Sequence, residues 1–180
     1  MKNSLLFVFM IFTLLVNAQN GKVEKNQLKL NFLVPGLKYE AGITDKTSVT
    51  FGVGMGFSII GGSNKDTEVS FFPFLESQYK YYYNFEKRRS KGKNTLNNSA
   101  NYISFIAVVQ SQKPLFKSDR YDDRALIVVG PTWGFQRTYK SGFNLSLDLG
   151  VGYAFESSGG NGFVSPLIDI ELGWVLNRKK

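Results

Sequence analysis

The chain has 180 residues, which is long enough for one domain or one compact barrel, and its 22 basic and 14 acidic side chains give a net charge of +8. The absence of Cys and His from the sequence excludes disulfides, Fe–S clusters, thiolate or imidazole metal sites and nucleophiles activated by His. A mean hydropathy of −0.15 is too polar for a bundle of transmembrane helices.

The first 18 residues are predicted to be a secretory signal peptide. Lys2 gives a positive start, residues 5–16 form an apolar run, and Ala18 ends the short segment expected before the cleavage site. The apolar run of 12 residues is shorter than the roughly 20 that a spanning helix needs. We expect cleavage after Ala18, a short polar lead-in over residues 19–26 and one barrel domain over residues 27–180. Because the chain is exported, nucleic acid is not expected as a partner despite the positive net charge.

Alternation of apolar and polar side chains with a period of two is the strongest pattern in the rest of the chain. Over residues 48–60 the apolar positions run from Val49 to Ile59, and over residues 143–156 they run from Phe143 to Phe155. Successive side chains of a strand point to opposite faces, so both segments are predicted to be amphipathic strands. The predicted strands cover residues 27–34, 37–43, 48–60, 69–85, 100–112, 124–139, 143–156 and 163–176. The first two could instead form one bent strand, but an antiparallel membrane barrel needs an even number of strands.

The direction of the apolar faces decides between two kinds of barrel, because a soluble barrel keeps its apolar face inside and a membrane barrel keeps it outside. These faces run for six or seven residues without a charge, which approaches the height of the lipid-facing band of a membrane barrel. The opposite faces carry glycines, such as Gly52, Gly54 and Gly56, beside charges of both signs. Glycines leave room for long side chains that cross a narrow interior. We therefore expect an all-β fold, an eight-stranded antiparallel up-and-down transmembrane β-barrel preceded by the cleaved signal peptide.

Aromatic side chains gather at the strand ends that an up-and-down order brings to one rim. They are Tyr79, Tyr81, Tyr83, Tyr102, Tyr139, Phe143 and Trp174. Such a girdle is typical of membrane barrels, because amphipathic rings favour the depth of the lipid headgroups. The ordinary strand propensity of aromatic residues is the alternative explanation.

With these patterns the chain resembles the small outer-membrane β-barrel proteins of Gram-negative bacteria, of the OmpA and OmpX architectural type. Residues 29–32, 38–40 and 172–176 look like the first and last strands of that family. The ending Trp174-Val175-Leu176 is similar to the signal read by the outer-membrane insertion machinery. The link over residues 86–99 departs from the family, because turns on the periplasmic side are usually short. It is expected either to invert the topology or to hold a small ordered element.

The strand face that we place inside carries charged side chains, which are expected to form a network of ion pairs that fills the interior. They are Lys29, Lys38, Glu40, Glu76, Lys80, Asp148, Asp169 and Glu171. A gated path or a proton-linked site within this network is the alternative. A wide diffusion pore is disfavoured, since the interior of an eight-stranded barrel is just wide enough for its own side chains.

A basic loop occupies residues 87–93. It contains Lys87, Arg88, Arg89, Lys91 and Lys93. We expect a solvated loop, and the alternative is contact with anionic lipid headgroups, acidic periplasmic partners or peptidoglycan. No metal is expected, because the acidic cluster over residues 119–124 matches no calcium-loop spacing and contains two arginines that could neutralise it. No cofactor is expected either, since the glycines from Gly52 to Gly56 do not have the spacing of a dinucleotide-binding loop.

Together these patterns predict an integral protein of the cell outer membrane with a structural or interaction role in the envelope and no catalytic activity. The expected partners are outer-membrane lipids and lipopolysaccharide, the insertion machinery, and a periplasmic or surface protein. Two alternatives stay open. One is a secreted soluble β-barrel that binds an apolar ligand, and the other is a narrow channel for small solutes.

Overall fold

A computed structural model describes residues 23–62, 65–116 and 124–177. The predicted signal peptide, residues 19–22 of the predicted lead-in and residues 119–123 of the acidic cluster lie outside these ranges.

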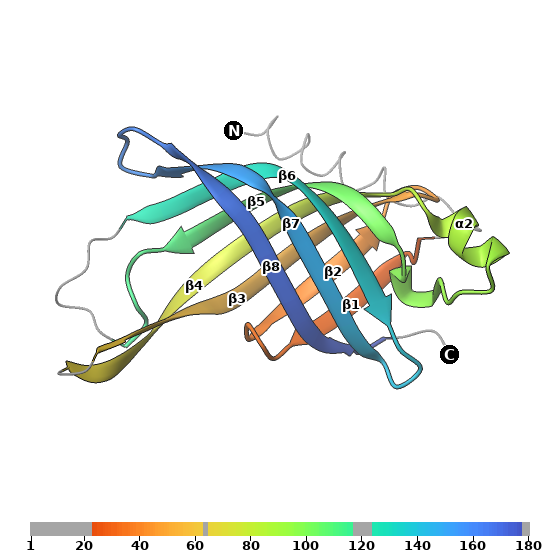
Figure 1. The fold of residues 1–180 in the computed structure, drawn as a ribbon, viewed down its shortest axis with the longest axis horizontal. Helices are drawn as coiled ribbons and strands as arrows, with labels where there is room; N and C mark the ends of the chain where they lie inside the picture. The colour runs from red at the N-terminus through yellow and green to blue at the C-terminus, as the bar shows by residue number, and fades with distance from the viewer. Residues whose placement is uncertain (1–22, 63–64, 117–123, 178–180) are drawn as a thin grey trace, which may run out of the picture.

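Eight antiparallel strands form a ring of hydrogen bonds, in which strands consecutive in the sequence pair and β8 pairs with β1 (Figure 1). The strands are β1 (Asn26–Asn31), β2 (Gly36–Gly42), β3 (Thr47–Gly62), β4 (Lys65–Tyr82), β5 (Asn101–Ser111), β6 (Ala125–Thr138), β7 (Phe143–Glu156) and β8 (Phe163–Val175). The prediction of eight antiparallel strands is confirmed, and the first two are separate strands joined by a turn.

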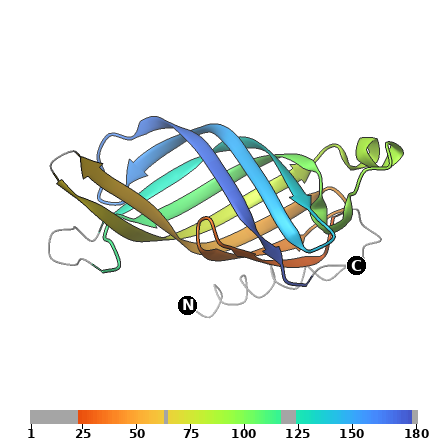
Figure 2. The same ribbon diagram turned by 60° about the horizontal axis from the view of Figure 1, so that its bottom comes forward.

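The ring has two ends. The near end holds the start of β1, the last residues of β8 and the connections β2–β3, β4–β5 and β6–β7. The far end holds the connections β3–β4, β5–β6 and β7–β8. The long β4–β5 connection contains a small ordered element, made of helix α2 (Phe85–Ser90) and the 3-10 turn η1 (Leu96–Asn98). Helix α2 projects beyond the near end in both Figure 1 and Figure 2.

The strands that form the wall of the ring differ in length, so the wall extends less far on one side than on the others. Strands β1 and β2 have 6 and 7 residues, whereas β3 and β4 have 16 and 18. The sequence prediction made the first strand too long, because residues 32–35 form the turn to β2. Gly36 suits the start of β2, since a Cβ atom there would lie 2.6 Å from the carbonyl oxygen of Val53. The β1–β2 hairpin therefore ends about halfway along β3 and pairs only with the last three residues of β8. Both neighbours run on past it in Figure 1.

Side chains alternate between the two faces of the wall, with apolar groups outside. On β3, Phe51 and Val53 are 57% and 52% exposed, whereas the alternating Gly52 and Gly54 are buried. Large apolar groups are exposed on every strand, among them Leu30, Tyr39, Phe51, Leu75, Phe105, Trp133, Val151 and Ile168. The buried set is mostly polar or charged. Within the part of the chain that the structure describes, no helix is long and apolar enough to cross a membrane.

Candidate functional site

The carboxylate of Glu40 is the centre of the first polar cluster, close to the near end. It accepts hydrogen bonds from the Lys29 ammonium at 2.6 Å, from the Ser48 and Tyr82 hydroxyls at 2.6 Å each, and from the Asn98 amide at 2.8 Å. Glu40 and Lys29 are at most 1% exposed. A buried ion pair with this many additional donors is satisfied in place, so it acts as a fixed part of the interior.

Lys38 is the centre of a second cluster, which lies farther from the near end of the ring. Its ammonium lies 2.7 Å from a Glu76 oxygen and 3.5 Å from an Asp169 oxygen, and it contacts Glu171 directly. Glu171 also accepts a hydrogen bond of 2.7 Å from the Ser146 hydroxyl. The three carboxylates have the spacing of a metal-ligand set, with oxygens within 4.8 Å of one another. The Lys38 ammonium contacts all three of them and lies where a metal ion would have to bind.

Asp148 is the centre of a third cluster and is held by neutral donors. The Tyr102 hydroxyl donates to one carboxylate oxygen at 2.7 Å, and the Gln78 amide and Thr132 hydroxyl donate to the other at 2.9 Å each. The Lys80 ammonium lies over the Tyr102 ring, 4.7 Å from its centroid. These contacts link Lys80 to the same cluster through a cation–π interaction.

Inward-facing glycines make room for these clusters. A Cβ atom at Gly52 would lie 3.0 Å from the Lys38 stem, which therefore runs across this part of β3. A Cβ atom at Gly134 would lie 2.6 Å from the Tyr102 ring and 2.7 Å from an Asp148 oxygen. The glycines thus have a packing role, which is to let long polar side chains meet in a narrow interior.

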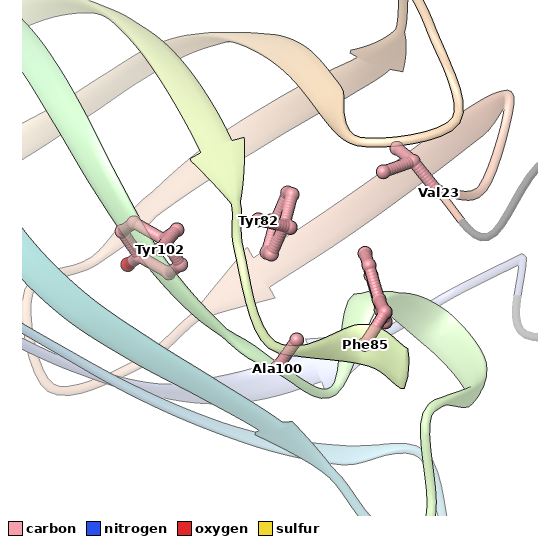
Figure 3. Packing of buried hydrophobic residues seen from close by; sticks show 5 residues of the cluster. All are labelled: Val23, Tyr82, Phe85, Ala100 and Tyr102. Atoms are coloured by element: carbon pink, nitrogen blue, oxygen red, sulfur yellow. The ribbon is translucent and has the colours of Figure 1, made fainter. Parts of the chain in front are cut away.

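A small apolar cluster closes the interior at the near end. It consists of Val23, Tyr82, Phe85, Ala100 and Tyr102, whose side chains converge in Figure 3 and are each at most 2% exposed. The Phe85 ring at the start of α2 stacks against Tyr82, with centroids 5.2 Å apart. Val23 belongs to the predicted polar lead-in, yet it is buried here. The β4–β5 connection therefore covers the near end of the polar interior.

The predicted aromatic girdle needs one correction. Tyr102 is fully buried inside the ring, because it lies opposite Tyr82 and Gly134, which also face inward. Proximity to the strand end suggested the girdle, but the two-residue period decides the face. The remaining predicted girdle residues are exposed or half-buried near the same end: Tyr79, Tyr81, Tyr83, Tyr139, Phe143 and Trp174. Phe143 packs edge-on against Trp174 with centroids 5.7 Å apart.

The basic loop becomes helix α2 and the link after it. Lys87, Arg89, Lys91 and Lys93 are exposed, and Arg88 is half-buried. The Arg88 guanidinium donates to the Asn94 carbonyl at 2.9 Å. Partial burial lowers the pKa of Arg88, which nevertheless keeps its charge at neutral pH because its ordinary pKa is so high.

A surface cavity of about 790 Å³ lies beside this loop at the near end. The β4–β5 connection and the β6–β7 turn line it together, so residues far apart in the sequence share one basic surface. Its charged lining residues are Arg88, Lys93, Arg137 and Lys140, and no acidic residue is among the lining residues. Sequence reasoning did not connect Arg137 and Lys140 to the loop, because only the fold brings them together.

All eight residues of the predicted interior network face inward, in the three clusters described above. Several neutral partners were missed, among them Gln78, Gln136, Ser146 and Tyr82. Strand parity was the signal that could have found them, since Gln78 stands between Glu76 and Lys80 on the same face. Asn98 had no such signal, because it lies in η1 with a positive φ of 57° that asparagine tolerates well.

The fold and these clusters define a small up-and-down β-barrel with a polar, hydrogen-bonded interior and an apolar exterior. The chain belongs to the DUF3575 family, a family of proteins of unknown function, whose profile matches residues 4–159. The match includes β1 to β7 and ends before β8. Neither the curated proteins nor the solved structures contain a match to this chain.

Proposed function

We propose that this protein is an integral barrel of the Gram-negative outer membrane, with a structural or interaction role in the envelope and no catalytic activity. The observation that carries the proposal is the inverted distribution of side chains: ion pairs are buried inside and large apolar groups face outward on every strand. Apolar outward faces match a lipid environment, and a polar interior filled by side chains matches a small membrane barrel.

The extent of the apolar exterior favours a membrane over water. Soluble monomers rarely expose contiguous apolar patches larger than a few hundred Å². Here exposed Phe, Leu, Ile and Val side chains follow one another round the ring, and Tyr and Trp side chains border them at the near end. A secreted soluble barrel would need the opposite arrangement, with its apolar faces inside and its polar faces towards water.

The interior favours a structural role over a conducting or catalytic one. The Lys29–Glu40 pair and the near-end cluster around Phe85 fill the lower part of the ring. The Glu40 and Asp148 carboxylates are occupied as hydrogen-bond acceptors, which supports a scaffold rather than a reacting group. A narrow channel for solutes is the second candidate, and it would require this filling to move.

The basic surface beside α2 supports contact with envelope components. Arg88, Lys93, Arg137 and Lys140 line one cavity next to the exposed Tyr139 ring. Each basic residue near an anionic membrane surface contributes about 1 kcal/mol to attraction. Lipid headgroups are therefore the proposed contact of this surface. Lipopolysaccharide and a periplasmic or surface protein are proposed as further partners. The insertion machinery is proposed to recognise the last strand.

The experiment that tests this proposal is heat-modifiability of the full chain. The protein is expressed in a Gram-negative host, the outer membrane is isolated, and samples are compared on SDS gels with and without boiling. A membrane-fraction protein that changes mobility on boiling supports the barrel in the membrane. Recovery in the soluble periplasmic fraction without a shift would contradict it and would favour the soluble ligand-binding barrel. Ion conductance in planar bilayers would favour the channel.

A further inference from the structure

The ring has a gap in its wall above the β1–β2 hairpin. On one side, β2 reaches only Gly54 of β3, whereas β3 continues to Gly62. On the other side, β1 reaches only Gly173 of β8, although β8 begins at Phe163. The gap begins where two backbone hydrogen bonds end the pairing of the hairpin with its neighbours. They run from the Met55 amide to the Pro35 carbonyl and from the Phe32 amide to the Leu172 carbonyl. In Figure 1, β3 and β8 run on past the end of the hairpin.

The inner face of β8 is accessible through this gap. Asp169 and Asp148 stand opposite each other on neighbouring strands and both face inward. The Asp169 side chain is 30% exposed, whereas Asp148 is 3% exposed. The two differ in that β8 lacks a neighbouring strand at this height, while β7 has β6 and β8 on either side. Asp169 is therefore exposed because no strand covers β8 on the side of the gap.

A cavity of about 290 Å³ lies directly behind the gap. Both edges of the gap line it, through Gly56 of β3 and residues 165–169 of β8, and Val34 of the hairpin turn lines its lower edge. Its remaining lining residues are Phe74, Glu76, Ile106, Val108, Gln110, Val128, Thr132 and Asp148. The space beside Gly56 is open, because a Cβ atom there would meet nothing nearer than 3.4 Å.

The lining residues define the chemistry of a ligand. The aliphatic and aromatic side chains suit a hydrocarbon chain. The volume corresponds to about ten water-sized groups at roughly 30 Å³ each, and a methylene group is of similar size. Glu76, Asp169 and Glu171 share the single ammonium of Lys38. The carboxylates there outnumber the ammonium groups, so an anionic headgroup is repelled and a cationic one is attracted.

We propose that this cavity binds a single-chain cationic amphiphile, an alkyl amine of about ten carbons, which passes through the gap between β3 and β8 with its amine beside Asp169. The route through the wall rests on the proposed function, because it places the outer face of the gap in lipid. The outward residues at the gap, Val164 and Ile168, are among the most exposed apolar residues in the described part of the chain, so the gap opens onto an apolar surface.

The test uses the absence of native cysteines, which makes single engineered thiols unambiguous. Val108→Cys places a thiol in the cavity, and the adjacent Val109→Cys places one on the outer face of the same strand. Ser104→Cys places a thiol in the buried Asp148 cluster below. Each variant is reconstituted in lipid vesicles and treated with a lipid-soluble alkyl maleimide or with a small, water-soluble sulfonated maleimide.

The proposal expects the alkyl maleimide to label Val108→Cys and Val109→Cys but not Ser104→Cys. Decylamine should protect Val108→Cys and leave Val109→Cys labelled, and decanoate should protect neither. Asp169→Asn in the Val108→Cys background should raise the decylamine concentration needed for protection about tenfold, the effect of losing one charged hydrogen bond.

Three results would overturn the proposal: no labelling of Val108→Cys by the alkyl maleimide, faster labelling of that thiol by the sulfonated reagent, or equal protection by decanoate. Val109→Cys separates this failure from failure of the proposed function. If the sulfonated maleimide labels Val109→Cys, the outer face is in water and the membrane location itself is wrong. If Val109→Cys reacts only with the alkyl maleimide while Val108→Cys does not react, the barrel is in the membrane and the gap is closed.

Discussion

Single side chains decide how the interior holds together. Glu40 connects three strands and η1, because its donors Lys29, Ser48, Tyr82 and Asn98 come from β1, β3, β4 and η1, and Glu40 itself lies on β2. A carboxylate with this position acts as a common acceptor for four segments of the chain.

Glu40→Gln is expected to destabilise the protein by about 3–5 kcal/mol, because it leaves the buried Lys29 ammonium without its counter-charge. The double variant Lys29→Met with Glu40→Gln should recover part of this loss, since it removes the Lys29 charge that Glu40→Gln leaves without its partner. Urea unfolding in lipid vesicles, followed by tryptophan fluorescence, measures the free energy of unfolding of the single and the double variant. Strictly additive effects of the two substitutions would contradict the coupling.

Gly134→Ala is expected to cost about 1–3 kcal/mol through overpacking, because its methyl group would meet the Tyr102 ring and the Asp148 carboxylate. Gly56→Ala is the matched control on the same inward face, and it should change the free energy of unfolding by less than about 0.5 kcal/mol. The same urea titration compares them. Equal stability of the two variants would show that Tyr102 can move aside without cost.

At the scale of the elements, the β4–β5 connection is more than a linker. Its first helix supplies Phe85 to the apolar cluster at the near end, and its η1 turn supplies Asn98 to the Glu40 cluster. The connection thus fastens the polar interior from one end while its exposed basic residues face away from it.

Phe85→Ala is expected to lower the free energy of unfolding by about 3 kcal/mol, the lower range for loss of a buried phenyl ring, because the cluster is small. Phe116→Ala is the control, since Phe116 is 82% exposed and should change stability by less than about 0.5 kcal/mol. Thermal unfolding in the same detergent compares the two variants. A similar loss of stability in both variants would contradict a structural role of the cluster.

Strand number, strand order and the inward face followed from the sequence because a two-residue period leaves little freedom. Lys29, Glu40 and Asp148 could be placed on the inner face by counting alone. The partners within the network could not, because which inward side chains meet depends on how neighbouring strands are staggered. The end of the first strand was predicted at Val34 and not at Asn31, since the apolar residues up to Val34 continue the alternation into the turn.

At the scale of the whole molecule, the apolar outer face of the barrel is expected to lie in lipid. Leu149→Arg, at mid-height on the outward face of β7, should destabilise the reconstituted protein by about 2–4 kcal/mol. Tyr81→Arg, at the near end of β4, should cost about 0–1 kcal/mol, because the cost of a charge falls towards the membrane interface. Unfolding in lipid vesicles measures the difference, and equal small costs at both positions would contradict a lipid-facing exterior.

The seam between β1 and β8 has a kinetic consequence. Only three residue pairs join these strands, and the Leu28–Asn177 hydrogen bond beside them connects residues 149 apart in the chain. Neighbouring hairpins can form early, but the seam must wait for the last strand and bears the entropic cost of closing the longest loop. Until then the sheet has two open edges, which invite pairing with another copy. The yield of monomer on refolding is therefore expected to fall as protein concentration rises.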